Sequence, residues 1–347
     1  MKDHAKRYPA YDVMRIVAAF SVILMHVTVD HVFSLPMESA EWMKGMALNS
    51  VSHFGVPVFV MISGALFLDS NRQIDIKRIW VHNILRIVLV LIVWSVFYGL
   101  TDYLEYRAEF VYVFREIIDG RHHLWFIPML AGLYMIQPVL LRWIKSASEN
   151  EVSYFLVMFL LVGVLWESLR SYGFSGVIEH LDKFRDVELF CSYVGYFVMG
   201  YYIAHIGFSA KVRKIIYLLC GLSILLLPVV SVLISRHRQI PVTAFSDSFS
   251  VFVFFISIGF FNMMVKIVGE RNIPQRYSCI LSELGRDTFG VYLCHIALME
   301  RIHVLGEWCE KLPLVPGALI YSLLLFILGT MISAVLRRLP IAGRYIC

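Results

Sequence analysis

The feature that most constrains this chain is a series of long apolar segments. A helix of about 20 apolar residues is long enough to cross the hydrocarbon core of a bilayer. Such segments lie near residues 11–30, 44–68, 79–100, 124–144, 152–169, 188–206, 213–235, 247–268, 280–300 and 313–336. We therefore predict an all-α integral membrane protein with about ten transmembrane helices, built as a single transmembrane domain over residues 8–338 with no soluble domain.

The composition supports a membrane protein. Of the 347 residues, 59% are hydrophobic and only 16% are charged, whereas a soluble domain typically carries about 25% charged residues. A soluble fold of this size needs a wettable surface, so the apolar excess must face lipid. Disorder, nucleic-acid binding and a secreted disulfide scaffold are therefore poor interpretations. The six cysteines show no CxxC spacing, and we expect no metal site.

The basic residues predict the orientation of the chain. If the N-terminus is cytoplasmic, 17 of the 31 Lys and Arg lie in cytoplasmic segments and 11 lie on the opposite side. The remaining three, Arg15, Arg86 and Arg286, lie within or at the ends of the predicted spans. Because Lys and Arg accumulate in cytoplasmic loops, we predict that both termini are cytoplasmic.

The first predicted span carries a polar stripe. Arg15 and His26 are eleven residues apart, which places them within about 20° of each other around a helix and roughly 16 Å apart along it. Asp12 lies on the same side, three residues before Arg15, and can pair with it. His26 can be a hydrogen-bonded core histidine. However, ionisable groups inside a membrane are costly, so we favour a functional role for this stripe.

Two further spans carry polar faces. In the second span, Asn49, His53 and Ser63 share one face, and Gly64 is expected to let a neighbouring helix approach closely. In the ninth span, Tyr292 and His295 lie on one face with Thr288. For the ninth span, a hydrogen-bonded contact between helices explains these residues as well as a catalytic role does. In the second span, helix packing explains the small residues, but Asn49 and His53 lie one turn apart and indicate a hydrated environment.

Four ordered motifs resemble those of a known family. They are YDVMRIVAAFSVILMH, which contains Asp12, Arg15 and His26, then VPVFVMISGALF, HHLWFIPMLAGLYMIQPVL and FGVYLCH. Together they resemble bacterial acyltransferase family 3, the membrane O-acyltransferases of surface polysaccharides, and within it the branch of the enterobacterial common antigen O-acetyltransferase. The resemblance covers nearly the whole chain.

The resemblance implies a function. A protein of this kind would move an acetyl or other short acyl group from cytoplasmic acyl-CoA to a hydroxyl of an extracytoplasmic or lipid-linked glycan. It would be a multi-pass protein of the bacterial cytoplasmic membrane. Its partners would be acyl-CoA as co-substrate, the glycan acceptor and the lipid bilayer, with no bound cofactor and no nucleic acid. His26 would be the essential histidine, acting as base or transient acyl acceptor, with Asp12 and Arg15 in the same motif.

Binding roles follow for other residues. The phosphates of acyl-CoA need cations, and Arg86, Arg78 and Lys77 lie near the predicted cytoplasmic end of the third span. The family often has Arg-x-x-Arg at this point, but Asn83 occupies the first position here. We expect the acceptor to be bound by Asn49, His53, Ser63, His123, Trp125, Tyr292 and His295.

A transporter or flippase of a small metabolite or a lipid-linked sugar is the main alternative. Ten spans with internal charges and helices interrupted by Pro and Gly suit that class equally well. The absence of a detectable internal repeat in the sequence counts against it.

Overall fold

The chain folds into an all-helical bundle, as the sequence predicts. The computed structural model describes residues 8–106, 110–172, 192–269, 271, 273–339 and 343. It is 86% helical, and no strand occurs among these residues. Eight helical segments in the described ranges are long and apolar enough to cross a membrane. Length and apolar surface together identify an integral membrane protein.

The spans correspond closely to the predicted segments. They are α1 (Pro9–Ser34); α2 (Ala40–Val51), η1 (Ser52–Phe54) and α3 (Gly55–Phe67); α4 (Ile76–Arg78), η2 (Ile79–Ile84) and α5 (Leu85–Tyr106); η3 (His122–Trp125) and α7 (Phe126–Ser146); α8 (Glu149–Met158), η4 (Phe159–Trp166) and α9 (Glu167–Ser171); α12 (Ala210–Arg238); η7 (Ala244–Ser246) and α13 (Val251–Ile267); and α16 (Leu314–Arg338).

Two predicted spans differ from these eight. The segment predicted at 188–206 contains α11 (Val194–Tyr201) and η6 (Tyr202–Ile206), a shorter apolar helix, and residues 188–191 lie outside the described ranges. The segment predicted at 280–300 is α14 (Gln275–Arg301), a long helix whose first half carries four charged residues. These charges lower its mean hydropathy, although its second half is buried in the bundle. Two shorter helices, α6 (Phe110–Asp119) and α15 (His303–Glu310), complete the described helices.

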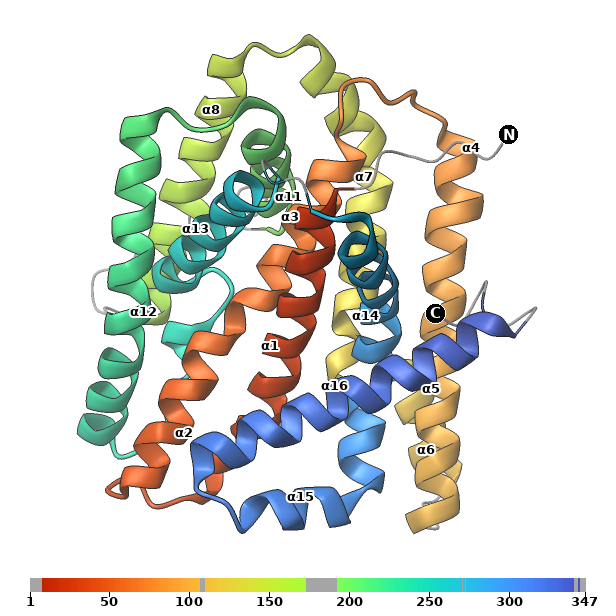
Figure 1. Ribbon diagram of the computed structural model, residues 1–347, viewed down its shortest axis with the longest axis vertical. Coiled ribbons are helices and arrows are strands. Elements are labelled where there is room, and N and C mark those ends of the chain that lie inside the picture. Colours follow the sequence, from red (N-terminus) through yellow and green to blue (C-terminus); the bar gives the residue numbers. More distant parts are fainter. Residues whose placement is uncertain are drawn as a thin grey trace.

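Helix α1 lies at the centre of the bundle. It packs against α14, α3, α2 and α16, and α16 crosses the other helices obliquely (Figure 1). We refer to the end of the bundle at which α1 begins as the Pro9 end and to the opposite end as the Ser34 end. By the basic-residue count, the Pro9 end is the predicted cytoplasmic side.

Small residues allow α3 and α11 to cross at backbone contact. A Cβ atom at Gly64 of α3 would overlap the carbonyl of Phe197 on α11, and one at Gly200 of α11 would overlap the carbonyl of Met61 on α3. This reciprocal pair confirms the expectation that Gly64 permits close helix packing, as small residues do in membrane bundles.

Charged networks hold α14 at its middle and at its C-terminal end. At the middle, Arg337 of α16 pairs with Asp287 (Nε to Oδ1, 2.8 Å), and Ser333 donates to the same carboxylate at 2.9 Å. At the Ser34 end, the buried Asp102 of α5 accepts from Arg121 at 2.8 Å and from Arg301 at 3.2 Å. The helix that carries Tyr292 and His295 is therefore held between two ion-pair clusters.

Candidate functional site

A cavity of about 440 Å³ opens in the Pro9 half of the bundle. Its walls come from the first half of α1, the length of α3, the η2–α5 junction, α7 and the middle of α14. The polar lining comprises Arg15, Ser63, His82, Asn83, Arg86, Tyr134, Arg286, Thr288 and Tyr292, with no Asp or Glu among the described lining residues. We call it the arginine cavity.

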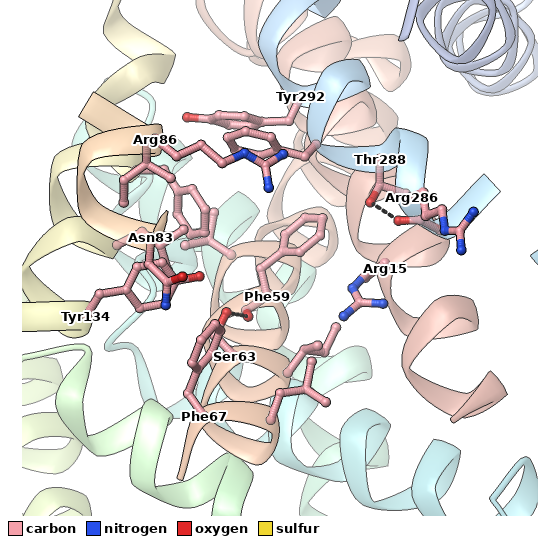
Figure 2. Close-up of a pocket in the computed structure, with 18 of the residues that line it drawn as sticks. Arg15, Phe59, Ser63, Phe67, Asn83, Arg86, Tyr134, Arg286, Thr288 and Tyr292 are labelled. Atoms are coloured by element: carbon pink, nitrogen blue, oxygen red, sulfur yellow. Dashed lines mark hydrogen bonds between the residues drawn. The ribbon is translucent and has the colours of Figure 1, made fainter. Parts of the chain in front are cut away.

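Two guanidinium groups point into the arginine cavity from different walls (Figure 2). Arg86 extends from the η2–α5 wall, and Arg15 extends from α1. Arg15 is held by Asp12, whose Oδ1 accepts from Nη1 at 2.8 Å, so the predicted pair is present. Arg286 turns away from the cavity in Figure 2 and pairs with Glu283. The guanidinium groups that face the cavity are therefore those of Arg15 and Arg86.

The other proposed donor-binding cations lie apart. Lys77 and Arg78 are exposed on α4 and are absent from the lining of the arginine cavity. His82 and Asn83, which belong to the π-helical turn η2, line the cavity beside Arg86 instead. Of the three predicted donor-binding residues, only Arg86 lines this cavity.

A second, larger cavity of about 950 Å³ opens at the Ser34 end. It is lined by the last turns of α1 and α14, by the start of α16 and by α15. Four histidines contribute, namely His26, His31, His122 and His303. We call it the histidine cavity. It shares no lining residue with the arginine cavity, and the two lie at opposite ends of α1 and α14.

The predicted catalytic residue His26 lies in a cluster of histidine rings. Its ring centroid is 5.1 Å from that of His295 and 5.5 Å from that of His122. His123 completes the cluster, 5.2 Å from His295 and 5.8 Å from His122. Within the described residues, no group of three or more His, Cys, Asp or Glu is arranged to hold a metal ion. The sequence predicted three of these four rings as site residues but assigned no role to His122.

Tyr292 and His295 connect the two cavities. Tyr292 lines the arginine cavity and its hydroxyl donates to the backbone carbonyl of His123. One turn further along α14, His295 is fully buried, and its ring lies 6.0 Å from that of Tyr292 and 5.1 Å from that of His26. The rings of Tyr292, His295 and His26 therefore form a row from the wall of the arginine cavity to the wall of the histidine cavity.

The buried histidines present unprotonated nitrogens to this cluster. His295 Nδ1 lies 2.6 Å from the carbonyl of Tyr292, and His123 Nε2 lies 3.4 Å from that of Leu293. A carbonyl only accepts, so each ring donates from that nitrogen. The other nitrogen in each neutral ring is then an acceptor, and both are buried with no hydrogen-bond partner among the described residues. The cluster can accept protons or hydrogen bonds from a group that enters it.

Asn49, His53 and Trp125, which were also predicted to bind the acyl acceptor, contact other parts of the protein. Asn49 donates to the carbonyl of Met25 at 2.9 Å, and His53 lies 3.3 Å from the side-chain oxygen of Asn49. These bonds attach α2 to α1 one residue before His26. Trp125 is exposed and packs on Tyr193. None of these three lines either cavity, whereas Ser63 does.

Two residues that the sequence did not single out, Arg121 and Tyr98, support the segments that carry the histidine rings. Arg121 directly precedes His122, pairs with Asp102 and Glu300, and lies over the ring of Tyr98. Tyr98 in turn donates to the carbonyl of Leu293 at 2.9 Å. The doubled histidine after Arg121 was the only local signal in the sequence for this region.

Comparison with known proteins identifies the chain at the family level. The family model described as an acyltransferase domain, that of acyltransferase family 3, matches residues 8–338, which is nearly the whole chain. No curated protein and no solved structure matches the chain.

Proposed function

Because this chain is a membrane protein that belongs to acyltransferase family 3, we propose that it is an O-acyltransferase of the bacterial cytoplasmic membrane. It transfers an acetyl or other short acyl group from cytoplasmic acyl-CoA to a hydroxyl of an extracytoplasmic or lipid-linked glycan. The family supports acyl transfer in general, and no observation supports the alternative of a transporter. Both termini lie in the cytoplasm, as the distribution of Lys and Arg indicates.

The observation that carries this proposal is the arrangement of the two cavities. They open towards opposite ends of the same two helices, and His26 lies in the wall of one while Tyr292 lies in the wall of the other. A donor made in the cytoplasm enters from the Pro9 end, and an acceptor displayed outside enters from the Ser34 end. The ring cluster between them is the place at which the two substrates meet.

The chemistry assigns a proton-transfer role to His26. Attack of the acceptor hydroxyl on the thioester carbonyl forms a C–O bond and breaks the C–S bond. The hydroxyl proton must leave during attack, and a histidine at this position takes it and returns it to the departing thiolate of CoA. Alternatively, His26 accepts the acyl group first and passes it to the hydroxyl. Arg15, one cavity away, serves the donor side, with Asp12 orienting its guanidinium.

The arginine cavity suits the polyanionic donor. Acyl-CoA carries phosphates, and charge-assisted hydrogen bonds from guanidinium groups to phosphates are the strongest polar contacts available to it. Arg86 and Arg15 provide two guanidinium groups in a cavity with no carboxylate among its described lining residues. Ser63 and Tyr292 on the facing walls offer hydroxyl groups to the acyl-carrying arm.

Replacement of Arg86 by glutamine is expected to weaken donor binding. Loss of one charge-assisted bond costs about 1.5–3 kcal/mol, so the KM for acetyl-CoA should rise about 10- to 100-fold. The kcat should change less, because the phosphates are remote from the bond that breaks. Steady-state kinetics with protein in nanodiscs measures both constants. Arg142→Gln, an exposed arginine on α7 outside the cavity lining, is the matched control. An unchanged KM in Arg86→Gln would remove Arg86 from the donor site.

The proposed activity itself can be tested with purified protein in nanodiscs. With acetyl-CoA radiolabelled in the acetyl group, we expect label to pass to a glycan acceptor or to water, and free CoA to accumulate. Exchange of a labelled solute across proteoliposomes without release of CoA would instead identify a carrier. Comparative mass spectrometry of cell-envelope glycans, with and without the gene, identifies the acceptor by the mass of the missing acyl group.

A further inference from the structure

The two cavities carry opposite charge. The described lining of the histidine cavity includes five carboxylates and neither Lys nor Arg, and these carboxylates belong to Asp30, Glu41, Glu300, Glu307 and Glu310. The arginine cavity is lined by arginines, and no carboxylate occurs among its described lining residues. A cavity lined by charge of one sign, with low-dielectric walls, selects its ligands by charge.

Three of the five carboxylates form no ion pair with a basic side chain among the described residues. Glu41 pairs with Lys44 and Glu300 pairs with Arg121, each at 2.7 Å. Asp30, Glu307 and Glu310 form no ion pair within the described part of the chain, and all three are exposed. Two of them lie on α15, the short helix that lines the cavity at its Ser34 end. The histidine cavity therefore holds a negative field.

The histidine cavity extends to the cluster of histidine rings. His26 forms part of its wall, and the ring of His295 lies 5.1 Å behind that of His26. His295 is fully buried, and its Nε2 has no hydrogen-bond partner among the described residues. A buried acceptor nitrogen behind the catalytic residue indicates that the cluster completes its hydrogen bonding with a group that comes from the cavity.

We infer that the histidine cavity is the acceptor site, and that it takes a sugar with no negative charge, either neutral or bearing a protonated amine. This inference rests on the proposed acyltransferase function. A carboxylate, sulfate or phosphate on the acylated sugar would lie near unpaired carboxylates and be repelled, and like-charge contact is an effective means of excluding a wrong ligand. A neutral sugar or an amino sugar is not repelled by these carboxylates, and a protonated amine is attracted to Asp30, Glu307 and Glu310.

The first test reads the acceptor directly. Glycans and lipid-linked sugars from cells with the wild-type chain and from cells with His26→Ala are compared by tandem mass spectrometry, which locates the acyl group on one sugar. The inference expects that sugar to be neutral or amine-bearing. An acyl group found on a uronic, sialic or phosphorylated sugar would overturn it. If the two cell types show no acyl difference at all, the proposed function fails instead.

The second test measures the sign of the electrostatic potential in the histidine cavity and does not depend on enzyme activity. Ser34 lines the histidine cavity, and Ser34→Cys places a thiol there. Its rates of reaction with two methanethiosulfonates, a cationic trimethylammonium-ethyl and an anionic sulfonatoethyl reagent, are read by peptide mass spectrometry. Relative to 2-mercaptoethanol in solution, the cationic reagent should be favoured about 10-fold or more. Glu307→Gln combined with Glu310→Gln should reduce this preference. An absent or reversed preference would contradict the inference, whatever the enzyme transfers.

Discussion

Replacement of His26 by alanine is expected to lower kcat for acyl transfer about 100- to 10,000-fold, the range that a general base contributes. His26 lines the histidine cavity, and its ring centroid lies 5.1 Å from that of the buried His295. The measurement is the release of CoA and the formation of acylated acceptor by protein in nanodiscs.

The controls for His26 separate chemistry from folding. His26→Gln retains a hydrogen-bonding side chain of similar length but cannot take the proton, so it should be as inactive as His26→Ala. His237→Ala removes an exposed histidine at the end of α12, outside both cavities, and should leave kcat unchanged. Each variant should elute as a single species with wild-type thermal stability within a few degrees. Activity of His26→Ala near the wild-type level would refute the assigned role.

The second large effect concerns the crossing of α3 and α11. Gly64→Val is expected to destabilise the protein by at least about 3 kcal/mol, at the upper end of overpacking costs, because the new side chain meets backbone and not a flexible side chain. Gly200→Val at the facing position should do the same. The measurement is thermal unfolding of detergent-solubilised protein, followed by the loss of the monodisperse peak in size-exclusion chromatography.

Matched glycines on other helices provide the control for this crossing. A Cβ atom at Gly132 on α7 or at Gly221 on α12 meets nothing within 4 Å. Gly132→Ala and Gly221→Ala should therefore be neutral or stabilise the protein by up to about 1 kcal/mol, since alanine favours helix over glycine. If Gly64→Val and Gly200→Val unfold at the same temperature as these controls, the close backbone contact is wrong.

Much of the fold could be predicted from the sequence because the bilayer imposes a strict length and hydropathy on each span. The predicted segments at 11–30 and 213–235 lie within α1 and α12, and the segment at 313–336 matches α16 except for Pro313, which caps that helix. The ninth segment, 280–300, is less apolar, and its helix carries charges that find partners on α16 only in three dimensions. Hydropathy predicts a helix from local residues, but it does not identify such partners.

The candidate site was predictable only along single helices. Helical periodicity placed Asp12, Arg15 and His26 on one stripe, and their common side is what brings Arg15 to one cavity and His26 to the other. His122 and His26 are almost a hundred residues apart in the sequence, yet their rings are neighbours. This contact depends on how separate helices pack, and the periodicity of a single helix does not predict it. The acidic lining supplied by Glu307 and Glu310 of α15 depends on the same packing of separate helices, and the sequence alone assigned these two residues no role.

The separation between the two cavities bears on the electrical insulation of the membrane. A protein with one aqueous passage from face to face would let protons and ions leak and dissipate the gradient that the membrane stores. Here the rings of Tyr292, His295 and His26 lie between two cavities that share no lining residue among the described residues. In the function that we propose, a small uncharged acyl group passes across this layer of rings while water and ions stay on their own sides. The proposed acylation of an outer sugar from an inner donor is then compatible with an energised membrane.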